Sequence, residues 1–517
     1  MAKDHPMLLH NLLRRIATRT PDRIALQDID SGATRTYREL YERAIRLGNG
    51  IRTLADRGDR IAILSENSLE YVEAYYGIPA AGLTLTMLNY RLHPREWVWI
   101  LNNARARVLL VAAPYYEAIA AYRDRLETVT EIVVVGGAVE GVPDYESFAG
   151  AARSAVPAED TTENDIAWLL YTSGTTGFPK GAQLTHRNLV TAVIQSALEY
   201  EPSDETVFLN AMPLCHVAGY LVPMNLFKGG RVLMMAGWDP ELWMRIVRDN
   251  AVTSGGFAPT MMAMLLNHPR LPDYDLSSLR WMGYGASKIP VEVLRRTIEH
   301  FGPIVYAGMG MTELGGNILT LDRRAHIRAA NGEDHLLDAA GKPMALVDVR
   351  IVDTAGRECA VGEVGEMVIR GNQVMAGYFG DPAATEQSFE GGWFHTGDLA
   401  RQDEEGFVYI VDRTKDMIIS GGENIYPSEV ENAIYALPEV AEAAVIGTPD
   451  PVWGERVTAV VVTRDGATVS PERIVAACKD RLASYKQPRE VYFVDELPKT
   501  VSGKIRKTDL RERFATG

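Results

Sequence analysis

The sequence predicts an α/β protein: a large N-terminal domain of packed α/β sheets with a β-rich subdomain, followed by a small, mobile α+β C-terminal domain. Two observations carry this prediction. Apolar runs alternate with helical patterns over the first part of the chain, and glycine-punctuated strand patterns replace them after about residue 340. At 517 residues the chain also exceeds what one hydrophobic core can hold, so two or more domains are expected.

The first part of the chain has the pattern of mostly parallel sheets. Four apolar runs are short enough for buried strands: residues 60–64, 108–111, 132–135 and 166–170. Helical periodicity covers residues 68–77 and 94–103, between the first two of these runs. Asp239 and Pro240 predict the start of another helix, because aspartate caps a helix and proline suits its first position.

The second part of the chain changes character twice. Strand-rich patterns at residues 347–352 and 365–370 predict a β-rich subdomain over about 340–412. A further change then separates an N-terminal domain over residues 1–412 from a C-terminal domain over residues 413–517.

The expected C-terminal domain has its own alternation of elements. Pro427 opens its first helix, because proline is favoured at the first helical position. Strands follow at residues 443–447 and 457–462, and Ser470 caps another helix. A compact domain of mixed helices and strands is therefore expected at this end of the chain.

Composition narrows the classes of function. A net charge of −15 disfavours nucleic-acid binding, and a site for polyphosphate must therefore be locally basic. Cys215, Cys359 and Cys478 lie far apart, which indicates a reducing, cytoplasmic location, and none forms a CxxC pair for zinc. Prolines and polar residues interrupt the longest apolar stretch, residues 211–227, so no integral membrane association is expected.

One loop carries the strongest chemical signal. Residues 171–181 follow an apolar run and read Tyr-Thr-Ser-Gly-Thr-Thr-Gly-Phe-Pro-Lys-Gly. Glycines allow close backbone approach, hydroxyl and N–H groups donate to oxygens, and the lysine neutralises charge, so the loop predicts a polyphosphate site. Pro179 before Lys180 and Gly181 after it differ from the Walker pattern. The alternative is a flexible surface loop.

Further motifs follow this loop in a fixed order. The six motifs are residues 171–181, 212–216, 308–313, 393–398, 412–424 and 498–504. Together they resemble the adenylate-forming superfamily, which contains acyl- and aryl-CoA synthetases, firefly luciferase and the adenylation domains of peptide synthetases. Fatty-acyl and aryl-CoA ligases are the branches that the chain resembles most. The resemblance implies that ATP and a small carboxylic acid give an acyl-adenylate and pyrophosphate, and that coenzyme A then displaces AMP.

The resemblance assigns the phosphate and metal contacts to the N-terminal domain. The β- and γ-phosphates of ATP would be held by Thr172, Ser173, Gly174, Thr175, Thr176, Gly177 and Lys180. Thr312 would donate to the α-phosphate, and Glu313 would hold Mg²⁺, which prefers hard oxygen ligands. For Glu313 the alternative is a carboxylate that complements a helix N-terminus.

The nucleoside contacts are also implied by the resemblance. Asp398 would accept hydrogen bonds from the ribose hydroxyls and Arg413 would add a second contact, the alternatives being a turn aspartate and a surface ion pair. Gly285 and Ala286 would pack against adenine. Relatives usually stack a tyrosine on the purine where this chain has Met309, and a thioether can also lie against an aromatic face.

The C-terminal domain would serve both half-reactions. Lys504 is expected to stabilise the adenylation transition state from a mobile loop, the alternative being a solvated lysine like Lys499 and Lys507. The domain would then rotate about a hinge at Lys415. The coenzyme A tunnel would be lined by Gly421, Gly422 and Glu423, for which a tight turn is the alternative. Two further residues are candidate contacts for its phosphates, with a solvated face as the alternative: Lys486 and Arg489.

The acid is expected to bind around the 212–216 motif. His216 would act as a gate or positioning group rather than a general base, and a core histidine is the alternative. Cys215 should point to the opposite face, so a Cys–His dyad is not expected. The expected acyl pocket is mostly apolar and small: Leu214, His216, Val217, Tyr220, Gly308, Gly310 and Gly315. Without a carboxylate to pair an amino group, it suits a medium-chain, aromatic or ring-bearing acid.

Three classes of function stay open at the level of sequence. The first is an acyl-CoA ligase, and the second is an acyl-adenylate ligase that loads the phosphopantetheine of a carrier protein. The third is a luciferase-like oxygenase or an inactive binding protein. Residues 391–429 lack the insertion that blocks coenzyme A use in carrier-loading relatives, and Lys504, Glu313 and the full phosphate loop argue against inactivity. The sequence sets no oligomeric state and is compatible with a homodimer.

Overall fold

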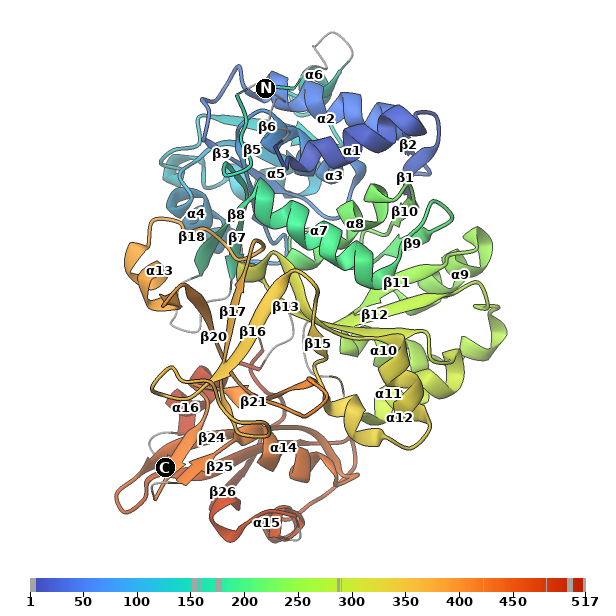
Figure 1. Ribbon diagram of the computed structural model, residues 1–517. Helices are drawn as coiled ribbons and strands as arrows, with labels where there is room; N and C mark the ends of the chain where they lie inside the picture. The colour runs from blue at the N-terminus through green and yellow to red at the C-terminus, as the bar shows by residue number, and fades with distance from the viewer. Residues whose placement is uncertain are drawn as a thin grey trace. The chain divides into compact units, whose positions relative to one another are not determined.

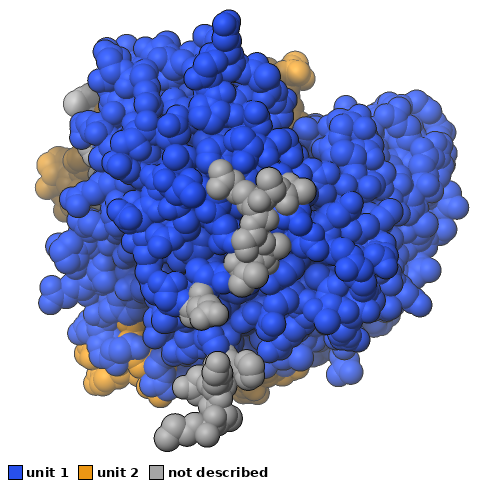
Figure 2. All heavy atoms as spheres, turned by 90° about the horizontal axis from the view of Figure 1, so that it is seen from above, with its two compact units in different colours: residues 1–348, 370–392 blue, residues 349–369, 393–517 orange. Residues whose placement is uncertain are grey.

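The computed structural model describes residues 6–150, 157–158, 160–172, 179–285, 289, 291–421, 423–479, 481–499 and 505–514 (Figure 1). The chain divides into two compact units, the first comprising Met1–Asp348 and Arg370–Gly392 and the second Val349–Ile369 and Trp393–Gly517 (Figure 2). The expected β-rich subdomain is therefore divided between the two units, with residues 349–369 and 393–412 in the same unit as the C-terminal residues. The expected boundary at residues 412/413 separates the N-terminal domain from a C-terminal domain that would rotate against it. That boundary stays a prediction.

The first unit contains a sheet with five adjacent parallel strands. Its order in the described chain is β18-β8-β7-β4-β3-β5-β6, in which β8 and β18 are antiparallel to their neighbours. The strands are β3 (Arg60–Leu64), β4 (Thr84–Leu88), β5 (Ala106–Ala112), β6 (Glu131–Val135), β7 (Ile166–Thr172), β8 (Lys180–Thr185) and β18 (Gly377–Tyr378). All four strands expected from apolar runs are present in this sheet, which confirms that part of the prediction.

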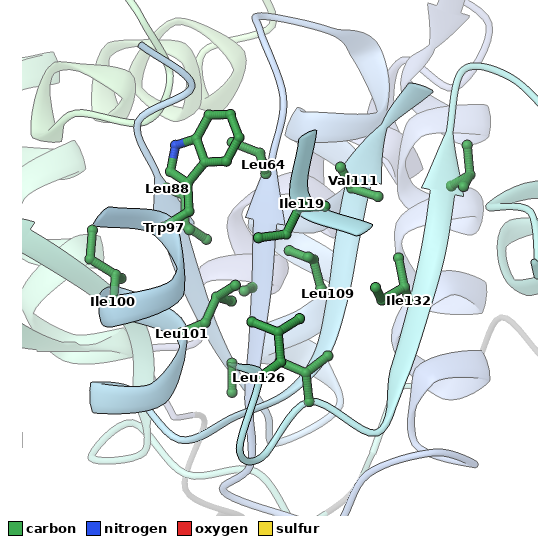
Figure 3. Packing of buried hydrophobic residues seen from close by; sticks show 14 residues of the cluster. Leu64, Leu88, Trp97, Ile100, Leu101, Leu109, Val111, Ile119, Leu126 and Ile132 are labelled. Carbon is green, nitrogen blue, oxygen red and sulfur yellow. The ribbon is translucent and has the colours of Figure 1, made fainter. Parts of the chain in front are cut away.

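A hydrophobic core covers one face of this sheet. Trp97, Ile100 and Leu101 of α4 and Ile119 of α5 are buried against leucines and valines of the strands (Figure 3). Burying a large apolar side chain contributes about 1.5–3 kcal/mol, so this cluster holds the helices firmly on the sheet. At the carboxyl edge of the same parallel strands, β7 ends at Thr172.

A second sheet in the first unit is also mainly parallel. Its order in the described residues is β15-β14-β13-β12-β11-β9-β10-β1-β2. The strands are β1 (Ile24–Asp28), β2 (Thr34–Thr36), β9 (Val207–Asn210), β10 (Arg231–Met234), β11 (Ser254–Phe257), β12 (Trp281–Gly285), β13 (Val305–Met311), β14 (Gly316–Leu321) and β15 (Lys342–Pro343). Strands β13 and β14 form an antiparallel pair, and their connecting turn carries Thr312 and Glu313.

Helices cover both sheets of the first unit (Figure 1). They are α1 (Leu9–Arg19), α2 (Tyr37–Ile51), α3 (Leu69–Ala80), α4 (Pro94–Asn103), α5 (Ala113–Ala120), α6 (Glu146–Ala149), α7 (His186–Tyr200), α8 (Leu221–Phe227), α9 (Pro240–Asn250), α10 (Pro259–Leu266), α11 (Val291–Phe301), α12 (Arg323–Ala330) and α13 (Pro382–Ser388). As expected, Asp239 caps α9, accepting a hydrogen bond from the Leu242 N–H at 2.7 Å. No helix in the described part of the chain combines the length and apolarity that a membrane crossing requires.

Two sheets account for most of the second unit. The first has the order β16-β17-β20-β19, with β21 also paired to β20, and the second has the order β23-β22-β25-β24, with β26 paired to β25. The strands are β16 (Val347–Val352), β17 (Gly365–Gly371), β20 (Trp393–Gln402), β21 (Val408–Arg413), β22 (Ile418–Ser420), β23 (Glu423–Ile425), β24 (Val440–Asp450), β25 (Gly454–Thr463) and β26 (Glu490–Phe493), while β19 (Phe389–Glu390) falls within the residues of the first unit. The helices are α14 (Pro427–Tyr435), α15 (Pro471–Lys479) and α16 (Lys507–Phe514). These elements confirm the α/β class and the α+β character of the C-terminal end.

Candidate active site

Two predicted phosphate-binding residues flank the glycine-rich loop. Strand β7 ends at Thr172 and β8 begins at Lys180, and the two residues are cross-strand partners. The Thr172 hydroxyl donates to the Lys180 carbonyl oxygen at 3.4 Å. The antiparallel pairing thus brings the lysine back to the carboxyl edge of the parallel sheet. The other predicted loop residues, Ser173, Gly174, Thr175, Thr176 and Gly177, lie outside the described residues, as does Ala286.

Lys180 and Glu313 contact the same tyrosine. The Tyr378 hydroxyl donates to Oε1 of Glu313 at 2.9 Å, and the Lys180 ammonium lies 5.2 Å from the centroid of the Tyr378 ring. Strand β18 pairs with β8, which places Tyr378 opposite Ala182 and beside the lysine. Tyr378 is not among the residues predicted from the sequence, where its only signal is an aromatic pair between two glycines. Among the described residues, neither Lys180 nor Glu313 has a direct ion-pair partner.

The turn that follows β13 holds the candidate metal ligand. Thr312 and Glu313 lie in the 3₁₀ turn η4 (Thr312–Leu314), where the Gly315 N–H donates to the Thr312 carbonyl at 3.1 Å. Gly315 has a φ of +64°, in the left-handed region that favours glycine. The Met375 N–H donates to the Glu313 carbonyl at 2.8 Å, which ties the turn to a second segment. A three-residue turn has little helix dipole, so it offers weak support for the dipole alternative.

The Glu313 carboxylate suits Mg²⁺ better than a metal ion whose ligands are all protein side chains. In the described part of the chain, no cluster of three or more His, Cys, Asp or Glu side chains is arranged to hold a metal ion. Mg²⁺ usually binds one or two carboxylates and takes its other ligands from water and phosphate oxygens. Oε2 of Glu313 has no hydrogen-bond partner among the described residues, so the carboxylate keeps an oxygen for such an ion.

Predicted acyl-pocket residues come together around the β13–β14 turn. A Cβ atom on Gly316 would lie 3.1 Å from the ring of Tyr220, so this buried tyrosine packs directly on the backbone of β14. Its hydroxyl accepts a hydrogen bond from the Ser196 hydroxyl at 3.2 Å. A Cβ on Gly310 would lie 2.0 Å from the Gly316 carbonyl oxygen, so the close approach of the two strands requires glycine there. The Tyr220 ring and the strands β13 and β14 therefore form one wall of the expected acyl pocket.

The 212–216 motif is anchored beside this wall. The Leu214 N–H donates to Asn67 Oδ1 at 2.8 Å, and the Tyr75 hydroxyl donates to the Leu214 carbonyl. Half-buried His216 precedes the 3₁₀ turn η2 (Val217–Tyr220), and its carbonyl accepts from the Gly219 N–H at 2.9 Å. Because η2 contacts β14, the turn carries Val217 and Tyr220 to the same region.

Two neighbouring predictions concern Cys215 and Met309. Burial raises the pKa of the Cys215 thiol to about 12, so the thiol stays protonated at neutral pH and is a poor nucleophile. This agrees with the expectation that no Cys–His dyad forms. Met309 pairs with Leu319 in β14, while Gly308 pairs with Gly285 of β12. Side chains alternate along a strand, so Met309 and the Gly308–Gly310 positions face opposite sides of β13.

The predicted ribose contacts lie in the second unit and bind each other. Asp398 of β20 and Arg413 of β21 are cross-strand partners, and Arg413 Nε lies 2.5 Å from Asp398 Oδ1. The Asp398 side chain is 5% exposed and that of Arg413 is 42% exposed, so the carboxylate is buried beneath the guanidinium. Lys415, the predicted hinge, follows β21 and is exposed, whereas the adjacent Asp416 is buried and pairs with Arg511 at 2.8 Å.

The predicted coenzyme A residues lie beside an aromatic side chain that sequence analysis missed. The Gly421 N–H donates to the Trp453 carbonyl at 2.8 Å, and a Cβ on Gly421 would lie 2.7 Å from the Trp453 ring. The Arg489 guanidinium stacks on that ring, 4.5 Å from its centroid. Glu423 is exposed in the same hairpin, and Gly422 lies outside the described residues. Trp453 itself is 43% exposed, which is unusual for so large an apolar side chain.

The lysines of the C-terminal end differ in their pairing. Lys504 lies outside the described residues. Lys499 pairs with Glu442, Lys507 pairs with Glu431 at 2.8 Å, and Lys486 pairs with Glu429. Lys499 and Ile505, which flank the undescribed residues, form an antiparallel β-bridge. The neighbouring lysines therefore have structural partners of their own.

Comparison with known proteins gives a consistent family. Residues 13–379 match the model of AMP-binding enzymes, and residues 429–504 match the AMP-binding enzyme C-terminal domain. A feruloyl-CoA synthase of Amycolatopsis sp. is 39% identical over 93% of this chain and 94% of its own. The long-chain-fatty-acid–CoA ligase FadD13 of Mycobacterium tuberculosis is 34% identical over 98% of both chains.

A solved structure extends the likeness from sequence to fold. The crystal structure of ATP-bound MatB from Rhodopseudomonas palustris matches with a TM-score of 0.88 and 30% identity, covering 98% of this chain and 99% of the other. The matched family regions contain the phosphate loop, the β13–β14 turn and the strands β24, β25 and β26. The chain therefore belongs to the AMP-binding enzyme family.

Proposed function

We propose that the protein is an AMP-forming acyl-CoA ligase whose substrate is an aromatic or ring-bearing carboxylic acid. The observation that carries the proposal is the group formed by Lys180, Tyr378 and Glu313. In this group Tyr378 contacts both the lysine and the carboxylate, which do not form an ion pair with each other, and Lys180 lies at one end of the phosphate loop. The relatives that cover nearly the whole chain are named as coenzyme A ligases, one of them for feruloyl groups.

In the first half-reaction, a carboxylate oxygen of the acid bonds to the α-phosphorus of ATP. The bond between the α-phosphorus and its bridging oxygen to the β-phosphate breaks, and pyrophosphate leaves with the electron pair. Negative charge on the phosphoryl oxygens calls for fixed donors and cations. Lys180, Thr172 and Thr312 would supply them from this chain, with Lys504 acting on the α-phosphate. Glu313 would hold Mg²⁺, which neutralises phosphate charge when bound.

In the second half-reaction, the sulfur of coenzyme A attacks the acyl carbon. The carbon–oxygen bond to AMP breaks, AMP leaves with the electron pair, and the thiol proton passes to solvent. Gly421 and Glu423 would line the path of the pantetheine arm, after rotation about Lys415. Trp453 would add an apolar surface for the nucleotide end, and Arg489 would add a cation for its phosphates.

The acid would bind between η2 and the glycine positions of β13. Leu214, Val217 and Tyr220 supply apolar surface there, and His216 would gate the passage to coenzyme A. Asp398 and Arg413 would hold the ribose, and Met309 would lie against the adenine in place of an aromatic ring. A cytoplasmic location and a homodimer complete the proposal, the first resting on three widely spaced cysteines.

Mass spectrometry of the products tests this proposal. Purified protein is incubated with magnesium-ATP, coenzyme A and a panel of aliphatic, aromatic and ring-bearing acids. Acyl-CoA with an equal amount of AMP is the expected product, with the aromatic and ring-bearing acids most reactive. Acyl-adenylate that accumulates without thioester would assign the carrier-protein function instead. Absence of both products from every acid would overturn the proposal, and oxygen uptake with adenylated acid would indicate an oxygenase.

A further inference from the structure

A polar group occupies the glycine face of β13, where the expected acyl pocket was mostly apolar. A Cβ atom on Gly308 would lie 2.0 Å from Nδ2 of Asn317 and 3.0 Å from the hydroxyl of Tyr200. The space that Gly308 leaves open is therefore filled by an amide and a phenol. The sequence motifs predict Gly308 in the acyl pocket but neither of the two side chains that lie against it.

A hydrogen bond to Tyr200 fixes the orientation of the Asn317 amide. Asn317 Nδ2 donates to the Tyr200 hydroxyl oxygen at 3.0 Å. In an amide the nitrogen donates and the oxygen accepts, so Nδ2 is the amide atom that faces Tyr200. Burial raises the pKa of Tyr200 to about 12, so its hydroxyl stays protonated at neutral pH.

The bond to Tyr200 leaves the side-chain acceptor of Asn317 without a partner among the described residues. Nδ2 is committed to Tyr200, and within the described residues Oδ1 of Asn317 accepts no hydrogen bond. Asn317 is only partly buried, so that oxygen can reach a ligand. An acceptor in this position gains a bond only from a ligand that carries a donor.

Contacts from two other segments hold Asn317 in place. Its backbone carbonyl accepts from Nε2 of Gln373 at 3.0 Å and from Nε2 of Gln195 at 3.4 Å. Gln195 Nε2 also donates to Oε1 of Gln373 at 2.8 Å, so the two glutamines support each other. Because backbone and side chain are both held, the amide loses little freedom when it binds a partner.

Aromatic rings pack against Tyr200, the partner of the amide. The ring of Tyr200 lies 5.2 Å from that of Trp281 and 5.9 Å from that of Tyr306, measured between centroids. Tyr220 packs on Gly316, the residue before Asn317. An acid suited to this surface combines a flat apolar ring with one hydrogen-bond donor.

From this geometry we infer that Asn317 is a specificity-determining residue that selects aromatic acids with a hydroxyl group on the ring end, remote from the carboxylate. The hydroxyl donates to Oδ1 of Asn317, and Tyr200 orients the amide. This inference rests on the proposed ligase function. A site that accepts a hydrogen bond from the substrate discriminates against the analogue that lacks the donor, because its own polar group then goes unpaired.

The test compares 4-hydroxycinnamate with cinnamate, which differ by one hydroxyl. In thioester formation, kcat/KM should favour 4-hydroxycinnamate by about tenfold or more. Asn317→Leu should bring the ratio close to one by slowing the hydroxylated acid while retaining activity on cinnamate. A wild-type ratio near one, or an equal loss for both acids in Asn317→Leu, would overturn the inference.

Two further variants separate recognition from packing. Tyr200→Phe keeps the ring and removes the hydroxyl that orients the amide, so it should reduce the ratio. Tyr306→Phe is the matched control, since its ring packs on Tyr200 but Tyr200 alone accepts the bond from Asn317, and it should preserve the ratio. Equal ratios in the two variants would count against the orienting role of Tyr200.

Calorimetric titration with each acid makes the test independent of turnover. Tighter binding of 4-hydroxycinnamate by wild type, and equal binding of both acids by Asn317→Leu, supports the inference even where no thioester forms. Equal binding by wild type, or no binding of either acid, refutes it. Thioester formed equally well from both acids would leave the ligase function standing and remove only the role of Asn317.

Discussion

Lys180 and Glu313 in the first unit meet through Tyr378, whereas Asp398 and Arg413 in the second unit form a direct ion pair at 2.5 Å. In the first case a neutral ring and hydroxyl stand between opposite charges, and each charge stays available to a phosphate or a metal ion. In the second case the guanidinium already satisfies one oxygen of a buried carboxylate. The first arrangement suits the binding of new charges, and the second suits an uncharged ligand such as ribose.

The same contrast separates the lysines of the second unit. Lys499, Lys507 and Lys486 each have a carboxylate partner, and such pairs fix a side chain in place. A lysine that acts on a transition state must instead reach the reacting atoms. Charged residues without a protein partner should therefore lose the most function when they are replaced, and paired ones the least.

Lys504→Ala should give the largest loss. Adenylation, measured as pyrophosphate release, should fall about a hundredfold or more, because the variant removes a cation from the transition state. Thioester formation from presynthesised acyl-adenylate should continue. Lys499→Ala and Lys507→Ala are matched controls whose partners are Glu442 and Glu431, and both should adenylate normally. An equal loss in both half-reactions of Lys504→Ala would contradict its assignment.

Asp398→Asn should act mainly on ATP use. It weakens the acceptor for the ribose and removes the partner of Arg413, so kcat/KM for ATP should fall about ten- to a hundredfold, the equivalent of about 1.5–3 kcal/mol. Steady-state kinetics at varied ATP measure this. Asp348→Asn breaks a different ion pair, with Arg370, in which both side chains are more than half exposed, and should change little. Unchanged ATP kinetics in Asp398→Asn would exclude the ribose role.

Tyr378→Phe tests the link between Lys180 and Glu313. The variant keeps the ring beneath the lysine and removes the donor to the carboxylate, so adenylation should fall about three- to tenfold. The magnesium concentration needed for half-maximal rate should also change, because the Glu313 carboxylate loses the hydrogen bond from Tyr378 and its affinity for the ion changes with it. Tyr409→Phe, which removes a hydroxyl bonded to Asp403, is the control. The same magnesium dependence in wild type and Tyr378→Phe would argue against Glu313 as the metal ligand.

Acid should loosen the first unit before the second. Burial lowers the pKa of His10 to about 3 and those of His186 and His326 to about 4. In His186, Nδ1 accepts from the Leu9 N–H and Nε2 donates to the Pro79 carbonyl, so protonation breaks the bond to Leu9 at the start of α1. The folded pKa lies below the unfolded value near 6.5, so the unfolded state binds more protons between the two.

Stability should therefore be complete above about pH 6.5 and should fall as the pH drops toward 4, by up to about 1.4 kcal/mol per pH unit for each histidine. Hydrogen exchange at pH 7 and pH 5 checks this, with protection lost first in α1 and α7. The second unit contains a single histidine, His395, which is paired with Glu366. His300→Gln, at an exposed position, should leave the pH dependence unchanged. Earlier loss of protection in the second unit would contradict the expectation.

Most of the fold could be predicted because its signals are local. The apolar run at residues 60–64 became β3 over the same residues, and the helical pattern at 94–103 became α4. Asp239 capped α9 as its chemistry requires. The pairing of the strands could not be predicted, since an apolar run does not indicate which other strand it pairs with. The antiparallel β8, which returns Lys180 to the end of β7, is one such case.

The candidate site divides in the same way. Lys180, Glu313, Asp398 and Arg413 stood out as charged residues within recognisable motifs. Tyr378 and Trp453 did not, because each acts through a residue far away in the sequence. Asn317 lies close to the 308–313 motif. The orientation of its amide depends on a hydrogen bond to Tyr200, which lies more than a hundred residues earlier in the chain.

The sequence by itself determined the family, the alternation of strands and helices, and the chemical types needed for ATP and an acid. These depend on side-chain periodicity and on short motifs, which survive without three-dimensional information. Only the tertiary structure decided which charges are paired, that a tyrosine separates Lys180 from Glu313, and that an amide fills the space over Gly308. Such facts depend on distances between segments remote in the chain, and burial makes those distances decisive, because an unpaired polar group away from water costs free energy.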